Sequence, residues 1–122
     1  MEKPTLADDA AGQPPIDMKS IDELREEGGD LFSELVEMFI TEVPLQLDTL
    51  AAALRKPDAG AARLAAHTLK GTASNFGAAR MRMLASSLEE KARNAALDGW
   101  PELHAELRVE CARVRKALES LR

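Results

Sequence analysis

Apolar residues recur at spacings of three and four along four stretches of the chain, a pattern that predicts amphipathic helices. The first stretch spans about residues 31–54 and follows Asp30, a residue type that favours the helix N-cap. Pro44 interrupts it, but the apolar positions continue in phase beyond the proline, so we expect one long kinked helix. Its apolar positions are Phe32, Leu35, Val36, Phe39, Val43, Leu47, Leu50, Ala51 and Leu54.

Three further helices follow after short connections. Pro57 and Asp58 end the first helix and cap the second, which we expect to stop at Gly77 and to bury Ala61, Ala65, Leu69, Thr72 and Phe76. The third, from about Ala79 to Leu97, would bury Met81, Leu84, Ala85, Leu88, Ala92 and Ala95. The fourth begins at Pro101 and carries Leu103, Leu107, Cys111, Val114, Leu118 and Leu121 on one face.

The N-terminal part has a different character. Residues 1–17 combine three prolines with charged and small residues, and we expect them to form a flexible tail or linker. Ser20 would cap a short helix that Gly28 and Gly29 terminate. Residues 18–122 then form one domain, an all-α, antiparallel up-down-up-down four-helix bundle preceded by a short extra helix.

A second apolar line on the first long helix consists of Leu31, Met38 and Leu45, seven residues apart. We expect the short N-terminal helix to cover this line. The alternative is an exposed apolar surface that binds a partner.

The composition argues against several classes of function. The 122 residues include three Phe, one Trp and no Tyr, with a formal net charge of −5, which argues against general nucleic-acid binding. No apolar run approaches the roughly 20 residues of a membrane span, and the N-terminus lacks a signal-peptide pattern, so we expect a soluble, cytoplasmic protein. The single cysteine excludes an internal disulfide, and no Cys/His cluster has the spacing of a metal site.

His67 has an unusual setting on the second predicted helix. At about 100° per residue, its ring points roughly 160° away from the centre of the buried stripe. Lys70 and Gly71 follow three and four residues later, and therefore lie beside the ring on the helix surface. Gly71 costs the helix about 1 kcal/mol relative to alanine, and no cap explains it. The pattern indicates that a large partner approaches an exposed imidazole.

The residues His67-Thr68-Leu69-Lys70-Gly71, followed by Phe76-Gly77-Ala78, resemble the histidine-containing phosphotransfer (HPt) domain family of bacterial multistep phosphorelays. The likeness extends from about residue 21 to the last helix. It implies that His67 is the phosphoacceptor, which takes a phosphoryl group through Nε2 from a receiver-domain aspartyl-phosphate and passes it to another receiver. The implied partners are response-regulator receiver domains and a hybrid sensor histidine kinase.

The resemblance also implies roles for the residues around the ring. Lys70 would stabilise the phosphoryl charge, and Gly71 would give the partner access. The chain has neither a carboxylate cluster for Mg²⁺, which we expect in the receiver, nor a phosphate-binding glycine loop for ATP. We therefore expect a monomeric phosphoryl carrier with no intrinsic cofactor, rather than a stand-alone enzyme.

Two alternatives share parts of this pattern. A P1-type phosphoacceptor domain of a chemotaxis-like kinase has a similar bundle, but its phosphoryl group comes from ATP bound on a separate catalytic domain. The dimerising histidine domain of a sensor kinase normally has an acidic residue directly after the histidine, where this chain has Thr68.

Other residues on the outer face are candidates for partner docking. Leu64 lies about 60° from His67 by the helical count, as either a hydrophobic anchor or the rim of the core, and we favour the anchor. Arg63 and Ser74 lie on the same outer face around His67 and are further docking residues. Arg63, Arg80 and Arg82 are either ordinary solvated residues or a basic rim that meets an acidic receiver.

The remaining polar candidates favour structural roles. We expect His104 to be structural or solvated and Cys111 to be a small core residue. The run Glu89-Glu90-Lys91 is typical of a solvated helix face with local ion pairs.

Overall fold

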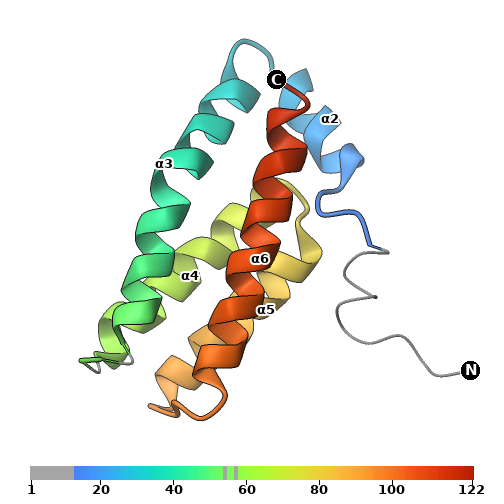
Figure 1. Ribbon diagram of the computed structural model, residues 1–122. Coiled ribbons are helices and arrows are strands. Elements are labelled where there is room, and N and C mark those ends of the chain that lie inside the picture. The colour runs from blue at the N-terminus through green and yellow to red at the C-terminus, as the bar shows by residue number, and fades with distance from the viewer. Residues whose placement is uncertain (1–12, 54, 57) are drawn as a thin grey trace, which may run out of the picture.

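The computed structural model describes residues 13–53, 55–56 and 58–122. Within these residues the chain forms five helices and no strands: α2 (Met18–Glu26), α3 (Leu31–Ala52), α4 (Ala59–Asn75), α5 (Ala79–Arg93) and α6 (Trp100–Glu119). Helices α3 to α6 alternate in direction, each packs against the next, and α6 closes the bundle against α3 (Figure 1). The predicted all-α, up-down-up-down four-helix bundle with a short N-terminal helix is confirmed. The expectations for residues 1–12, Leu54 and Pro57 lie outside the described residues.

Helix α4, which carries His67, begins and ends where the sequence predicts. Asp58 is its N-cap, and the side-chain Oδ1 accepts a hydrogen bond from the Ala61 N–H at 3.0 Å. Gly77 follows the C-cap residue with a left-handed φ of +62°. A Cβ at Gly77 would lie 2.5 Å from the Cβ of Asp17, so the chain segment before α2 can pass this close only to a glycine.

The buried face of α4 is rotated from the predicted one. Ala61 is exposed and Thr72 is half-buried, although both were predicted to be buried. The alanines of α4 itself lie on most sides of the helix, so the apolar pattern alone does not determine which side is buried. The buried residues are Ala62, Ala65, Ala66, Leu69, Ala73 and Phe76. Because α5 also buries small alanines, the two helices can approach closely, which brings polar groups on α5 within reach of His67.

Helix α3 is continuous across Pro44, as predicted, whereas the degree of kinking stays a prediction. Five of its predicted core residues are buried: Phe32, Val36, Phe39, Val43 and Leu50. Helix α2 does not cover the second apolar line, because Met38 and Leu45 are both more than half exposed. The preferred prediction is wrong for Met38 and Leu45, for which the alternative of an exposed apolar surface describes what is found, whereas Leu31 is half-buried.

The last two helices differ from the prediction mainly at their ends. Helix α5 stops at Arg93 rather than near Leu97, and Ala95, predicted to be buried, is exposed with a left-handed φ of +53°. Helix α6 begins at Trp100 instead of Pro101. The Trp100 side chain is fully buried, and its Nε1–H donates to the Leu50 carbonyl at 2.9 Å, which ties α6 to α3.

Part of the predicted tail, within residues 13–17, packs against the bundle. Ile16 is buried in the core, and the Asp17 N–H donates to the Phe76 carbonyl at 3.1 Å. Arg113 donates to the Gln13 carbonyl at 2.8 Å, which holds this segment against α6. Ser20 lies inside α2, whose N-cap is Asp17, so the predicted Ser20 cap is wrong.

Candidate functional site

His67 is displayed on the surface of α4, beside α5. Its side chain is 62% exposed. The ring Nδ1 lies 2.9 Å from Oε2 of Glu89, a residue of α5. One edge of the imidazole is therefore anchored to the neighbouring helix, while most of the side chain remains accessible to a partner.

Glu89 is the buried centre of the site, although the sequence suggested a solvated residue. Its side chain is only 5% exposed, and its second oxygen, Oε1, lies 2.7 Å from Nζ of Lys70. Arg93, one turn further along α5, approaches Oε2 to 3.5 Å. A buried carboxylate is stable only when paired, and here the partners come from both helices. The prediction of a solvated Glu89 is wrong for this reason.

The charge state of Glu89 follows from these contacts. The hydrogen bond from Lys70 lowers the pKa of Glu89 most, and the hydrogen bond from His67 adds to this, while burial opposes both. The net direction is downward, so Glu89 is a carboxylate near neutral pH and can only accept hydrogen bonds. In the neutral imidazole Nδ1 must then carry the proton. This leaves the lone pair on Nε2.

Gly71 leaves open space beside the ring. A Cβ built at this position would meet nothing within 4 Å, so no packing contact requires the glycine. Leu64 is 65% exposed and therefore does not belong to the core. Both positions stay on the outer face of α4, as the helical count predicts.

The predicted docking arginines and Ser74 have different partners in the structure. Arg80 bridges α5 to α6 through Glu106 at 2.9 Å and Glu110 at 3.8 Å, and its side chain is nearly buried. It is neither solvated nor part of a rim, so both interpretations of Arg80 are wrong. The Arg82 Nε–H donates to Ser74 Oγ at 3.1 Å, and that hydroxyl donates to the Lys70 carbonyl.

Arg63 is exposed on α4. With Arg82, it is the part of the predicted basic rim that remains on the outer surface.

Comparisons with known proteins agree with this geometry. The Hpt domain family model matches residues 34–117. The chain belongs to the Hpt domain family. The crystal structure of histidine-containing phosphotransfer protein B (HptB) from Pseudomonas aeruginosa is similar, with a TM-score of 0.82 and 34% sequence identity over 88% of this chain and 93% of that one. A search of curated proteins found no significant match.

The family resemblance inferred from the residues around His67 is thus confirmed, and the chain is a histidine phosphotransfer protein of phosphorelays. Hpt domains are phosphoryl carriers that work with receiver domains and kinases. Across the described part of the chain, no helix has the length and apolar character needed to cross a membrane. The described residues also contain no group of three or more His, Cys, Asp or Glu side chains that could hold a metal ion.

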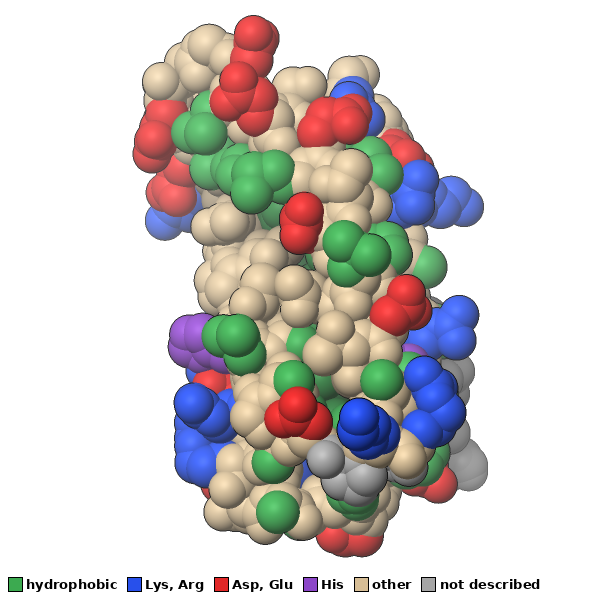
Figure 2. Space-filling view, turned by 90° about the vertical axis from the view of Figure 1, so that its left-hand side faces the viewer, with side chains coloured by type: hydrophobic (Ala, Val, Ile, Leu, Met, Phe, Trp, Pro, Cys, Tyr) green, Lys and Arg blue, Asp and Glu red, His purple; other side chains and the backbone are tan. Residues whose placement is uncertain are grey.

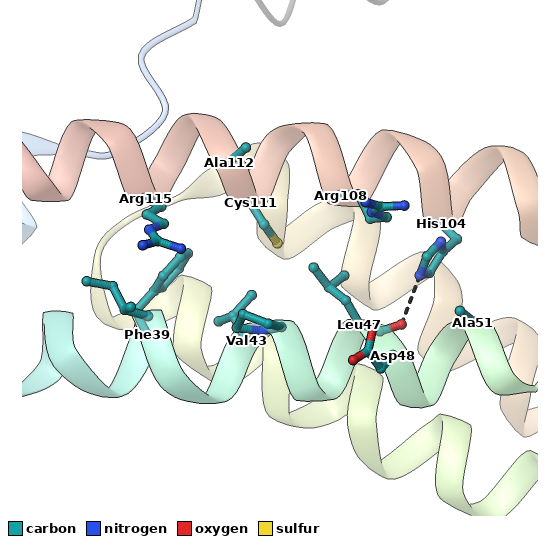
Figure 3. Close-up of a pocket in the computed structure, with 12 residues that line it drawn as sticks. Phe39, Val43, Leu47, Asp48, Ala51, His104, Arg108, Cys111, Ala112 and Arg115 are labelled. Carbon is teal, nitrogen blue, oxygen red and sulfur yellow. Dashed lines mark hydrogen bonds between the residues drawn. The ribbon is translucent and has the colours of Figure 1, made fainter.

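A separate cleft of about 410 Å³ lies between α3 and α6 of this Hpt domain (Figure 3). His104 lines it, but its Nε2 is bound to the Leu47 carbonyl at 2.9 Å, which confirms the structural role predicted for this histidine. Cys111 is buried at the same cleft, and burial, with a smaller effect of Glu110, raises the pKa of its thiol to about 12. The Cys111 thiol is therefore not a nucleophile near neutral pH.

Sequence reasoning missed Glu89 and Arg93. A signal for Glu89 was present, because it lies four residues after the buried Ala85 and three before the buried Ala92, at the edge of the apolar stripe of α5. A charge at such a position indicates a carboxylate at the edge of the core, although the pattern does not identify its partners. Arg93 could then have been found as its neighbour one turn later.

Proposed function

We propose that His67 accepts a phosphoryl group from a receiver-domain aspartyl-phosphate and transfers it to a second receiver. The observation that carries this proposal is the contact between His67 Nδ1 and the buried Glu89 carboxylate at 2.9 Å. This contact fixes the ring tautomer, and so leaves Nε2 as the nucleophile on a side chain that is 62% exposed.

The transfer step follows from the tautomer. The Nε2 lone pair attacks phosphorus, the Nε2–P bond forms, and the bond between phosphorus and the aspartate oxygen breaks, which releases the receiver's carboxylate. The ring then bears a positive charge, because Nδ1 keeps its proton. Glu89 stabilises that charge through the hydrogen bond already in place, without reorganisation at the moment of reaction. Transfer to the second receiver is the reverse of this step.

Lys70 and Gly71 complete the site. The Lys70 ammonium lies on the same side of α4 as His67 and neutralises negative charge on the phosphoryl oxygens, since phosphoryl transfer depends mostly on positioning and charge stabilisation. The open space at Gly71 admits the receiver's active-site loops. The Mg²⁺ that assists the transfer would be held by the receiver.

The docking surface would be the outer face of α4 together with the adjoining face of α3. Leu64, Met38 and Leu45 are the exposed large hydrophobic residues of these two helices. Figure 2 looks onto the α3 side, where hydrophobic side chains lie beside an exposed histidine at the left edge, with cationic side chains below it. Leu64 would supply the hydrophobic anchor, while Arg63 and the Arg82–Ser74 pair would orient an acidic receiver.

A donor comparison tests this function. The protein, expected to be monomeric, is mixed either with a receiver domain carrying aspartyl-phosphate or with ATP and a histidine-kinase catalytic domain. We expect phosphorylation from the receiver and none from the kinase domain. Phosphorylation only by the kinase domain would instead show a P1-type phosphoacceptor.

A further inference from the structure

Three donor groups converge on the single carboxylate of Glu89. Lys70 Nζ reaches Oε1 at 2.7 Å, whereas His67 Nδ1 and Arg93 share Oε2 at 2.9 and 3.5 Å. The Glu89 side chain is 5% exposed with these partners in place, so they, rather than water, offset its charge. Any movement of Lys70 therefore changes the charge balance of a buried anion.

Phosphoryl transfer makes two demands on Lys70. Its ammonium is bound to Glu89 before the reaction, yet Lys70 also lies within one turn of His67, where it can meet a phosphoryl group on Nε2. It cannot neutralise both anions at full strength. If Lys70 turned toward the phosphoryl group, Oε1 of Glu89 would lose its close donor, and the His67 ring and the long contact with Arg93 would both remain at Oε2.

Arg93 is placed to replace Lys70 as the cation beside Glu89. It stands one turn from Glu89 on the same helix, so it can approach the carboxylate without any shift of the backbone. Its side chain is 55% exposed and its contact with Oε2 is long, which leaves room for a closer one. A guanidinium can bind a carboxylate with two parallel hydrogen bonds, a geometry that a lysine lacks.

We propose that Arg93 is a positioning residue for phosphoryl transfer, which takes over the charge of Glu89 and so frees Lys70 for the phosphoryl group. The role rests on the proposed function of His67. It predicts that Arg93 matters for transfer only while Lys70 is present, because Arg93 acts through Lys70 and touches no reacting atom.

Phosphoramidate tests the role without any partner protein. Its P–N bond breaks and the Nε2–P bond forms, while ammonia leaves, so the rate of phosphohistidine formation measures the site alone. We expect Arg93→Ala to slow labelling about two- to fivefold, the range for a half-exposed ion pair. Lys91→Ala is the matched control, because Lys91 is a cation of the same helix that contacts Asp98 rather than Glu89. This variant should be labelled at the wild-type rate.

Two further variants separate positioning from structure. In a Lys70→Ala background, Arg93→Ala should cause no additional slowing, because Arg93 acts through the Lys70 ammonium and that group is gone. Arg93→Lys, which keeps the charge, should recover at least part of the lost rate. Thermal melts of the Arg93 single variants should stay close to wild type, whereas the Lys70→Ala variants lose a partner of the buried Glu89 and are compared with each other at a temperature where both are folded.

The outcomes are distinct. Equal slowing by Arg93→Ala with and without Lys70, or no slowing in the wild-type background, would overturn the role of Arg93. A wild-type protein that forms no phosphohistidine at His67 would overturn the proposed function and this role with it. Slowing that depends on Lys70 and is rescued by Arg93→Lys supports the proposal.

Discussion

Replacing Glu89 with glutamine keeps the shape of the side chain but removes its charge and one of its two acceptor oxygens. In the structure, Oε2 faces His67 Nδ1 at 2.9 Å and Oε1 faces Lys70 Nζ at 2.7 Å. A glutamine has one carbonyl oxygen, so its NH₂ group would point at a second donor. The variant can therefore keep only one of the two contacts, and neither is charge-assisted by a carboxylate.

The expected effect on transfer follows from the lost hydrogen bond to the charged ring. A hydrogen bond to a charged group contributes about 1.5–3 kcal/mol. The positive charge on the imidazole develops only as the Nε2–P bond forms, so the loss falls on the transition state. At about 1.4 kcal/mol per factor of ten, Glu89→Gln should slow phosphoryl acceptance about ten- to a hundredfold.

The same substitution should change the acid stability of the fold. Lys70, and to a lesser degree His67, holds the pKa of Glu89 below its ordinary value of 4.5 in the folded state. A carboxyl whose pKa is lowered by folding stabilises the protein above its unfolded pKa, and this contribution is lost as pH falls through the folded pKa. The wild type should therefore lose free energy of unfolding below about pH 4.5, and the variant should lose less over the same range.

Receiver-to-protein transfer rates and urea unfolding at neutral and acid pH measure both effects. Glu90→Gln is the matched control, since it makes the same chemical change at the adjacent, exposed position. It should leave the rate unchanged. A folded Glu89→Gln variant that accepts the phosphoryl group at the wild-type rate would refute the positioning role of Glu89.

Three further experiments test the access glycine, the docking residue and the buried cysteine. Gly71→Gln should raise the free energy of unfolding by up to about 1 kcal/mol while blocking receiver docking. Gly71→Ala should also stabilise the fold, with a smaller loss of docking. Normal docking by Gly71→Gln in receiver titrations would contradict the access role. Leu64→Asp should weaken receiver binding about tenfold or more with little change in melting temperature, because the residue is exposed; unchanged binding would place the docking face elsewhere. Cys111, whose pKa is raised to about 12, should resist iodoacetamide at pH 7.5 until the protein is unfolded; rapid alkylation of the native protein would contradict its burial.

The fold was largely predictable from the sequence because large apolar residues mark its helices. Phe32, Phe39 and Leu50 on α3 and Leu107 and Leu118 on α6 follow the helical period and are all buried. Several large apolar residues in phase along one face outweigh single exposed ones such as Leu64, so their spacing identifies both the helix and its inner face.

The orientation of α4 was harder to predict, and the reason is alanine. Ala61 and Ala62 are chemically identical neighbours, yet only Ala62 is buried. A methyl group contributes little to burial on either side, so packing against α5 and α3 decides the rotation. The error was small enough that His67 was still placed outside the core.

The electrostatic centre of the site could not be derived from local pattern alone. Glu89 lies 22 positions from His67 in the sequence, and its burial is stable only because α4 supplies Lys70 and His67. Arg80 was misjudged for a related reason, since its partners Glu106 and Glu110 come from α6. Pairing between helices depends on tertiary contacts, and helical periodicity does not contain that information.

The most direct measurement compares the two histidines of the chain as phosphoryl acceptors. His67→Gln and His104→Gln variants are each incubated with a receiver that carries labelled aspartyl-phosphate, and thermal melts confirm that both are folded. We expect His104→Gln to accept the label like the wild type, and His67→Gln to accept none. Label on the folded His67→Gln variant, or its loss from His104→Gln alone, would contradict the assignment of His67 as the phosphoacceptor.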